Sequence, residues 1–267
     1  MSRRLHLAFA RAAKARRAAF IPYITAGDPT LRQTSALIAA LERAGADIVE
    51  LGVPFTDPIA DGPTNQRAAE RALAQGTTLA GVLQLVRELR YSSQVPVVLF
   101  TYYNPVHAYG LARFAIDAAG AGVDAVLFTD VPVEEAQPAW ESLKRVGVDL
   151  VLLVSPTSTK ARVKAARRLP GSFAYFISRT GVTGTRERLE EELEDQVRLV
   201  RRLMRRRVAV GFGVSTPDQV SRIAKYADGV VVGSALVEHI AELGDRPQLA
   251  AEIETVARRF AVATSRR

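Results

Sequence analysis

Short apolar runs alternate with amphipathic helical patterns along the whole chain. Eight runs rich in Val, Ile, Leu and Phe have the length and composition of strands, at 19–25, 48–51, 96–101, 125–129, 150–154, 173–177, 208–211 and 229–232. Several are apolar at nearly every position, which is typical of strands buried on both faces of a parallel sheet. The pattern therefore predicts parallel strands that are separated by helices.

Helix boundaries carry signals of their own. Thr30, followed three residues later by Gln33, has capping-box spacing, and Gly45 ends that helix. Thr216 before Pro217 is typical of an N-cap followed by the first helical turn. Further helical patterns lie between or after the strands, at 66–74, 79–89, 111–119, 133–146, 189–205, 235–241 and 249–263.

The number and order of these elements fit an α/β fold, the (β/α)8 TIM barrel, whose usual length is about 250 residues. We expect one domain over residues 1–267, with an extra N-terminal helix and a short helix after the eighth strand. An open, doubly wound sheet is the alternative. Because the first strand ends in AGDPT rather than in GxGxxG, the dinucleotide-binding fingerprint of that fold is missing.

The first 20 residues are basic and amphipathic, with Leu5, Phe9 and Ala12 or Ala13 at helical spacing. They lack the continuous apolar core of a secretory signal, and the first strand follows too closely for a transit peptide. No apolar run approaches the ~20 residues of a membrane span. We therefore expect a cytoplasmic protein that begins with a structural helix.

Composition narrows the possible chemistry. The absence of Cys excludes disulfides, Cys-based zinc sites and a Cys nucleophile, and it fits a reducing compartment. His6, His107 and His239 match no metal-ligand spacing, so we expect no metal site. The net charge of +8 raises the question of nucleic acid, but the excess lies in short Arg runs without interleaved aromatic residues. We therefore expect an Arg-rich, solvated surface.

The segment 48–63, IVELGVPFTDPIADGP, concentrates the candidate chemistry. Glu50 lies inside an apolar strand, and charged side chains are almost never buried unless they are paired or used. In a parallel barrel, active sites lie at the C-terminal ends of the strands, which makes Glu50 a candidate catalytic carboxylate. From the local pattern alone, an outward Glu50 paired with an Arg of a covering helix is an equal alternative. Asp61 is a second candidate, or a turn-former before Gly62 and Pro63.

Glycines follow three consecutive strands, at 181–184, 211–213 and Gly233. In TIM barrels a phosphate often binds where the last loops meet a short extra helix. Glycines let the backbone approach an anion, and N–H groups at a helix start bind it. The hydroxyl of Ser234 is a further donor. These features predict a phosphate site near the ends of the sixth to eighth strands.

Five motifs occur in one order across the chain, namely IPYITAGDP, ELGVPFTDPIADGP, RTGVTG, GFGVS and VVGSALV. Together they resemble the tryptophan synthase alpha-subunit family, and the second motif is highly specific. The resemblance implies a carbon–carbon lyase of tryptophan biosynthesis. It would cleave indole-3-glycerol phosphate by a retro-aldol reaction to indole and glyceraldehyde 3-phosphate, without a cofactor. The resemblance also implies an αββα complex, in which the beta subunit carries pyridoxal phosphate and joins indole to serine.

The same resemblance implies roles for individual residues. Glu50 takes the position of the acid/base and Asp61 that of the second carboxylate. The substrate-binding positions fall on Tyr23, Phe100, Tyr102, Leu127, Leu153, Tyr175 and Thr183, and the phosphate-binding positions on Gly184, Phe212, Gly213, Gly233 and Ser234. Asn65 departs from the Ile or Val that the family usually has there. Because it lies past the carboxylate, we expect it to leave the chemistry unchanged.

The chemistry explains why two carboxylates are needed. Indole is a poor carbanion, so its C3 atom must be protonated before the carbon–carbon bond breaks. Apolar neighbours would raise the pKa of Glu50, which suits a proton donor. Asp61 would stay ionised and accept the indole N–H. The family further suggests that a closing loop brings Thr183 to Asp61, and that segments 54–63 and 104–110 face the beta subunit.

Three other functions are alternatives for this sequence. Another phosphate-binding barrel enzyme, such as an isomerase or epimerase, would usually need a Lys, His or metal cluster at the strand ends, and none is evident. A catalytically silent regulatory subunit would not need Glu50 and Asp61. A free-standing indole-3-glycerol-phosphate lyase would have the same active site, so sequence alone leaves that alternative open.

Overall fold

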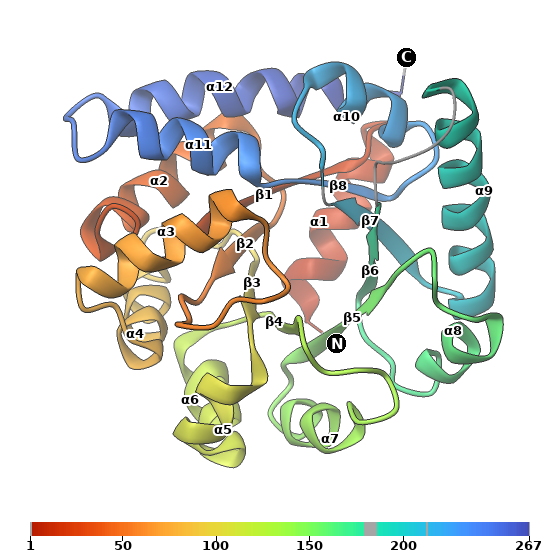
Figure 1. The fold of residues 1–267 in the computed structure, drawn as a ribbon, viewed down its shortest axis with the longest axis horizontal. Helices are drawn as coiled ribbons and strands as arrows, with labels where there is room; N and C mark the ends of the chain where they lie inside the picture. Colours follow the sequence, from red (N-terminus) through yellow and green to blue (C-terminus); the bar gives the residue numbers. More distant parts are fainter. Residues whose placement is uncertain (1, 179–185, 212, 267) are drawn as a thin grey trace.

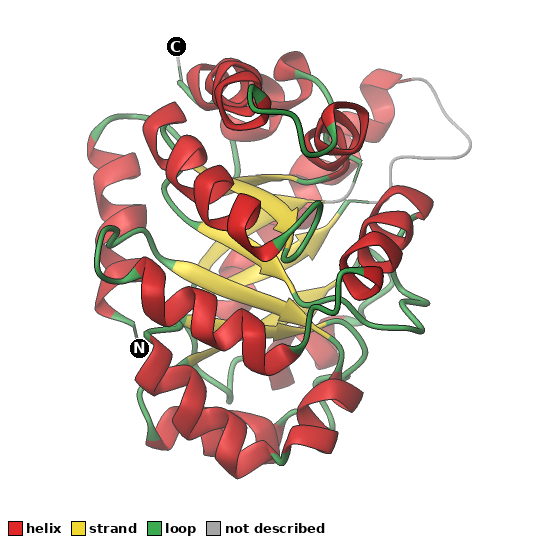
Figure 2. Cartoon of the chain, turned by 90° about the vertical axis from the view of Figure 1, so that its left-hand side faces the viewer, coloured by secondary structure: helices red, strands yellow, loops and turns green. Residues whose placement is uncertain are grey.

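Eight parallel strands close a barrel in sequence order in the computed structural model, which describes residues 2–178, 186–211 and 213–266. The strands are β1 (Ala19–Thr25), β2 (Val49–Gly52), β3 (Val97–Thr101), β4 (Ala125–Phe128), β5 (Asp149–Val154), β6 (Phe173–Ile177), β7 (Arg207–Gly211) and β8 (Gly229–Val232). Each pairs with the next, and β8 pairs with β1 (Figures 1 and 2). The predicted TIM barrel is confirmed, and the open sheet is excluded.

Helices surround the barrel, as Figure 2 shows in red around the yellow strands. They are α1 (Arg3–Lys14), α2 (Leu31–Ala44), α3 (Pro63–Ala74), α4 (Leu79–Leu89), α5 (Tyr103–Tyr109), α6 (Leu111–Ala121), α7 (Gln137–Arg145), α8 (Lys160–Ala166), α9 (Arg186–Met204), α10 (Pro217–Ala224), α11 (Ser234–Leu243) and α12 (Leu249–Ala263). In the described part of the chain, no helix is both long and apolar enough to cross a membrane.

Two local predictions need correction. The backbone N–H of Gln33 donates to Thr30 Oγ1 over 3.1 Å, but the Gln33 side chain donates to Asp245 instead of returning to the cap, so only half of that capping box forms. The segment that contains Asn104 and Pro105 was not among the predicted helices, yet it forms α5. Pro105 is compatible with this helix because it lies in the first turn, where no intrahelical N–H bond is lost.

Apolar side chains fill the interior of the barrel, and a helix closes its N-terminal end. Side chains that alternate along the strands, such as Ile21 on β1 and Val151 on β5, fill the interior. Helix α1 closes the N-terminal end of the barrel and is seen behind its centre in Figure 1. Leu5 and Phe9 of α1 are buried there, and the Phe9 ring lies 5.3 Å from that of Phe173 at the start of β6. The C-terminal end of the barrel is left for the functional site.

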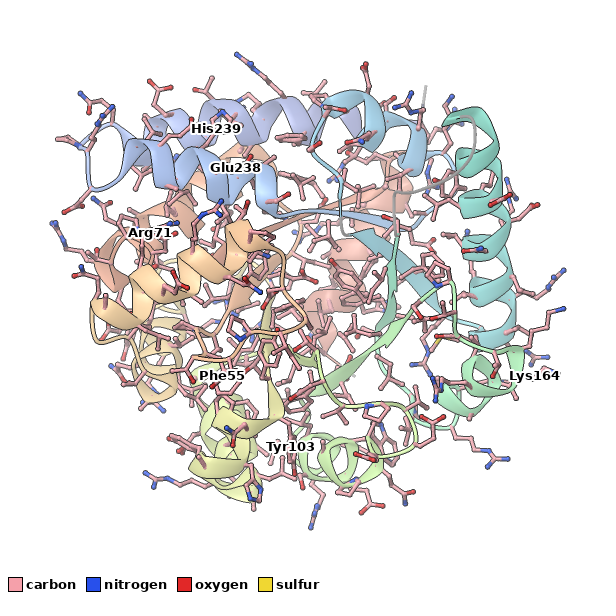
Figure 3. The ribbon with its side chains drawn as sticks, in the orientation of Figure 1. Phe55, Arg71, Tyr103, Lys164, Glu238 and His239 are labelled. Atoms are coloured by element: carbon pink, nitrogen blue, oxygen red, sulfur yellow. The ribbon has the colours of Figure 1, made fainter. Side chains whose placement is uncertain are left out.

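Helix α3 is attached to the C-terminal end of β1. Arg71 on α3, labelled in Figure 3, donates from Nε and Nη2 to the two carboxylate oxygens of Asp28 over 2.9 and 2.7 Å. Asp28 follows β1 and is buried. Such a two-pronged bond fixes direction as well as distance, so α3 is held in one orientation at the barrel mouth.

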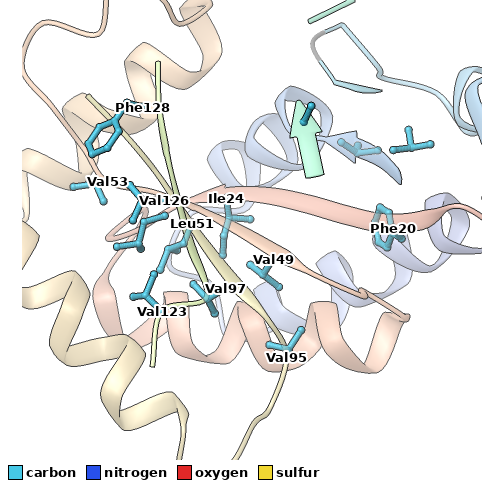
Figure 4. Close-up of a cluster of buried hydrophobic side chains, with 14 of the residues drawn as sticks. Phe20, Ile24, Val49, Leu51, Val53, Val95, Val97, Val123, Val126 and Phe128 are labelled. Carbon is cyan, nitrogen blue, oxygen red and sulfur yellow. The ribbon is translucent and has the colours of Figure 1, made fainter. Parts of the chain in front are cut away.

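The outer faces of the strands pack against the helices in a second apolar cluster. Ile24, Val49, Leu51 and Val97 belong to it (Figure 4). Each alternates along its strand with residues that face the barrel interior. The strands are therefore buried on both sides, which explains why their sequences are nearly continuous in apolar residues.

Candidate active site

Glu50 lies in the barrel interior. Its register on β2 sets it between Tyr23 of β1 and Val98 of β3, two members of the interior cluster. The side chain is 0% exposed, and neither carboxylate oxygen has a hydrogen-bond partner in the described part of the chain. Burial raises the pKa of Glu50 to about 8, because the charged form cannot be solvated there. The alternative of an outward Glu50 paired with Arg is wrong.

Asp61 ends the loop between β2 and α3, and its backbone forms a turn. Its N–H donates to the carbonyl of Pro58 over 3.0 Å, and its carbonyl accepts from Gln66 Nε2, also over 3.0 Å. The turn-forming interpretation is therefore correct for the backbone. The carboxylate group of Asp61 takes no part in this backbone turn.

The Asp61 carboxylate is held by two side chains. Tyr102 donates its O–H to Oδ2 over 2.9 Å and accepts in turn from the backbone N–H of Ala60 over 2.9 Å. The side-chain amide of Asn65 lies beside Asp61 and, like Tyr102, favours its charged form. Burial raises the pKa of Asp61, and these two neighbouring side chains act in the opposite direction by stabilising the charged form.

A cavity of about 220 Å³ opens at the C-terminal ends of the strands. Tyr23 and Phe100 form an aromatic part of its wall, with their rings edge to face at 5.3 Å. The residues that line it are Tyr23, Glu50, Gly62, Pro63, Thr64, Asn65, Phe100, Tyr175, Gly213, Val214, Val231, Gly233 and Ser234. The cavity thus combines a buried carboxyl group with aromatic surface and with backbone from glycine-rich loops.

Two glycines make room for the tyrosines of this cavity. A Cβ atom on Gly52 would overlap the hydroxyl group of Tyr23, and one on Gly211 would overlap that of Tyr175. Any larger residue at these strand ends would displace the rings. These glycines are therefore needed for close approach of side chains rather than for a turn.

The loops after β7 and β8 form the part of the cavity suited to an anion. Gly213 has a φ of +78°, a conformation that favours glycine. Gly233 precedes α11 and Ser234 begins it, and the helix has no side-chain cap. The first N–H groups of a helix have no partner within the helix, and the helix dipole favours negative charge there. This end of the cavity can bind a phosphate group.

The structure places the described candidate residues in three groups. Tyr23, Phe100, Tyr175, Gly213, Gly233 and Ser234 line the cavity with Glu50, whereas Tyr102 supports Asp61. Leu127 and Leu153 belong to the packed interior and not to the cavity lining. Thr183, Gly184 and Phe212 lie outside the described residues. Among the residues described, no group of His, Cys, Asp or Glu is arranged to hold a metal ion.

Sequence reasoning missed several lining residues. Thr64 and Asn65 lie on the first turn of α3, three and four residues after Asp61, so their nearness to Asp61 in the sequence was a usable signal. Val231 lies two residues before Gly233, so strand alternation was a usable signal for it. Val214 directly follows the GFG motif and had no signal beyond that proximity.

Comparisons with known proteins agree with this geometry. The family model described as tryptophan synthase alpha chain matches residues 9–265. The tryptophan synthase alpha chain of Geobacter sp. (strain M21) is 52% identical over 221 residues, which are 83% of each chain. That of Solibacter usitatus is 49% identical over 242 residues, or 91% of each chain.

Solved structures show the same similarity. Tryptophan synthase subunit alpha from Legionella pneumophila superposes with a TM-score of 0.90 at 33% identity, covering 99% of this chain and 98% of that one. A chain from the tryptophan synthase a2b2 complex of Pyrococcus furiosus superposes with a TM-score of 0.84 at 39% identity, covering 92% and 98%. The extent of the sequence match, together with the shared barrel, means that this chain belongs to the tryptophan synthase alpha chain family.

Proposed function

We propose that this chain cleaves indole-3-glycerol phosphate to indole and glyceraldehyde 3-phosphate in the last stage of tryptophan biosynthesis, with Glu50 as the acid/base. One observation carries the residue assignment. The carboxyl group of Glu50 is fully buried and has no hydrogen-bond partner in the described residues, and it lies in the wall of a cavity at the barrel mouth. Membership of the tryptophan synthase alpha chain family supports the reaction.

The acid/base chemistry follows from the pKa of Glu50. With a pKa of about 8, the side chain is mostly protonated at neutral pH. It donates this proton to C3 of the indole ring, which gives an indoleninium ion. The resulting carboxylate takes a proton from the hydroxyl group on the adjacent carbon, the carbon–carbon bond breaks, and its electrons return to the ring. A positioned acid or base typically contributes ~10²–10⁴-fold.

Asp61 stabilises the positive charge that this route creates. As a carboxylate it accepts the ring N–H, where charge develops once C3 is protonated. The neighbouring side chains of Tyr102 and Asn65 favour its ionised form. A hydrogen bond to a charged group is worth about 1.5–3 kcal/mol net, so this contribution is smaller than that of the acid/base.

The phosphate group and the indole ring of the substrate are assigned to different parts of the cavity. The phosphate binds at Gly213, Gly233 and Ser234, beside the start of α11, and family resemblance adds Gly184 and Phe212. Tyr23, Phe100 and Tyr175 enclose the apolar ring. Leu127 and Leu153 back this pocket from the barrel interior, and Thr183 acts in loop closure.

A beta subunit completes the reaction sequence. We assign this chain to an αββα complex, in which the partner carries pyridoxal phosphate and joins indole to serine. The similar Pyrococcus furiosus chain comes from an a2b2 complex. The loop after β2 carries Ile59, which is 86% exposed, and Phe55 of this loop lies on the same side of the barrel as Tyr103 of α5 (Figure 3). These segments are the proposed partner face of one cytoplasmic barrel domain, residues 1–267.

Indole release from indole-3-glycerol phosphate tests the proposal, with and without a beta subunit. We expect wild type to form indole, a beta subunit to raise the rate, and Glu50→Gln to abolish it. Glu242→Gln, on the exposed surface of α11, is the matched control and should retain the wild-type rate. Inactive wild type in the complex would make the chain a regulatory subunit. High activity that is unchanged by the beta subunit would identify a free-standing lyase.

A further inference from the structure

Asn65 lies closer to the chemistry than its place in the sequence suggests. It follows Asp61 by four residues, at the third position of α3, and the first turn of that helix places it beside the carboxylate. Its side chain lines the cavity together with Glu50 and Tyr175. The expectation that Asn65 leaves the chemistry unchanged therefore conflicts with its position.

The neighbouring carboxylate of Asp61 determines which end of the Asn65 amide faces the cavity. An ionised carboxylate can only accept hydrogen bonds, so the N–H₂ end of Asn65 must face it. The carbonyl Oδ1 then points away from Asp61. This oxygen is buried and has no hydrogen-bond partner in the described part of the chain. A buried acceptor without a partner is costly unless a ligand donates to it.

We propose that Asn65 is a specificity-determining residue for the indole ring, which holds Asp61 with its N–H₂ group and offers Oδ1 as a second acceptor for the ring N–H. The inference rests on the proposed function. It differs from the usual family arrangement, because the Ile or Val common at this position can make neither contact.

The ring N–H is the group on the substrate that suits this oxygen. The phosphate needs donors, which the start of α11 supplies. The ring nitrogen is the donor on the aromatic part of the substrate, and it becomes more acidic as C3 is protonated. Two neighbouring acceptors, Asp61 and Asn65 Oδ1, then share one N–H and face the developing positive charge.

Binding of two substrate analogues separates this role from a structural one. Indole-3-propanol phosphate keeps the ring N–H and lacks the two hydroxyl groups, and its 1-methyl derivative has no ring N–H. Calorimetric titration of both analogues gives an affinity ratio for each variant. We expect Asn65→Ile and Asn65→Val to reduce the wild-type preference for the N–H analogue by about threefold to tenfold, as loss of one hydrogen bond implies. Both substitutions restore residues that the family tolerates there.

Thr64→Val is the matched control on the same helical turn. Thr64 also lines the cavity, but its hydroxyl donates to Glu238 of α11 over 3.1 Å and not to Asp61. Because Thr64 lines the cavity, we allow the affinity for both analogues to change together, and we expect only their ratio to stay at the wild-type value. An unchanged ratio in both Asn65 variants would overturn the inference alone. Failure of wild type to bind either analogue would overturn the proposed function and the inference with it.

The pH dependence of turnover gives a second readout. Loss of the Asn65 N–H removes one of two donors that favour ionised Asp61, so its pKa rises and the acid limb of the profile moves to higher pH. The other titratable groups facing Asp61 in the described residues are Tyr102, Tyr23 and Tyr175, with Glu50 in the same cavity. An acid limb that stays at the wild-type position in both variants would contradict the positioning role.

Discussion

Glu50 is a fully buried carboxylic acid whose oxygens have no hydrogen-bond partner among the described residues. A group of this kind avoids ionisation by keeping its proton, and its pKa rises to about 8. The raised pKa of Glu50 has opposite consequences for the stability of the fold and for the reaction. The protein is destabilised whenever the group must lose its proton, and the reaction gains an acid that is still protonated at neutral pH.

The stability of the Glu50→Gln variant should depend on pH relative to wild type. In the unfolded chain Glu50 loses its proton near the ordinary glutamate pKa of 4.5, whereas the folded chain holds it until about 8. Wild type therefore loses stability as pH rises between these values, by up to ~1.4 kcal/mol per pH unit. Glu50→Gln escapes this loss. Urea unfolding at pH 5, 7 and 8.5 should show a widening advantage for the variant.

Glu242→Gln is the control for that series, because Glu242 is exposed on α11. Its stability should track wild type at each pH. A Glu50→Gln advantage that is the same at all three pH values would show that Glu50 is not held neutral by burial.

Gly211→Ala should damage the cavity without changing any polar group. The new Cβ atom would overlap the hydroxyl group of Tyr175, so the ring must move. Displacement of a substrate-positioning group by about 1 Å can cost on the order of 10²-fold, and we expect kcat/KM for indole release to fall by about that factor. Gly120→Ala on α6, where the Cβ meets open space, should leave kcat/KM unchanged. Equal activity of the two variants would contradict the packing argument.

At the scale of elements, α3 carries much of the site. Its first turn follows Asp61 directly and contains Asn65, and its later turns carry Arg71. The Arg71 guanidinium binds Asp28 after β1. This ion pair lies outside the cavity lining, but it fixes the helix that follows Asp61, the second carboxylate. The positions of Asp61 and Asn65 therefore depend on how α3 is attached to the barrel, as well as on the residues that line the cavity.

Arg71→Leu should loosen α3. The substitution leaves the buried Asp28 carboxylate without these two donors, which costs about 1–3 kcal/mol of unfolding free energy. We also expect weaker binding of indole-3-propanol phosphate, since Asp61 and Asn65 lose their fixed support. Arg67→Leu, exposed on the same helix, is the comparison. Denaturant titration and calorimetry on both variants check the result, and equal behaviour would remove the role given to the Arg71–Asp28 pair.

At the scale of the whole molecule, the two ends of the barrel have different tasks. Helix α1 packs Leu5 and Phe9 into the N-terminal end, where the interior is filled. The open end contains Glu50 and the cavity. In TIM barrels this division is general, because the loops at the C-terminal ends vary while the opposite face maintains stability.

Phe9→Ala tests that division. Removal of a buried aromatic ring that packs on Phe173 should cost about 3–5 kcal/mol of stability. The kcat/KM of the folded protein at 25 °C should stay at the wild-type value, because the ring lies at the opposite end of the barrel from the cavity. Leu7→Ala, exposed on the same helix, should change neither quantity. Loss of kcat/KM in fully folded Phe9→Ala would show that the two ends are coupled.

The strands could be predicted because the signals that mark them are local in the sequence. Each strand bound lies within one residue of its predicted position, because apolar runs between turn residues are a local property. Helix α5 was missed since Asn104 and Pro105 favour turns, and their place in a first helical turn was not anticipated. Gln33 was predicted to complete a capping box, but Asp245, distant in sequence, provides a better partner.

The sequence by itself determined the number and order of the strands, the family motifs and the position of a carboxylate at a strand end. These follow from periodicity and short motifs, which neighbouring residues set. Only the tertiary structure decided that Glu50 faces inward, because closure of the barrel sets which strand face is interior. It also joined Asp61 to Tyr102, 41 residues away, and left Asn65 Oδ1 buried without a described partner. Such contacts depend on how distant elements pack, and no local pattern encodes them.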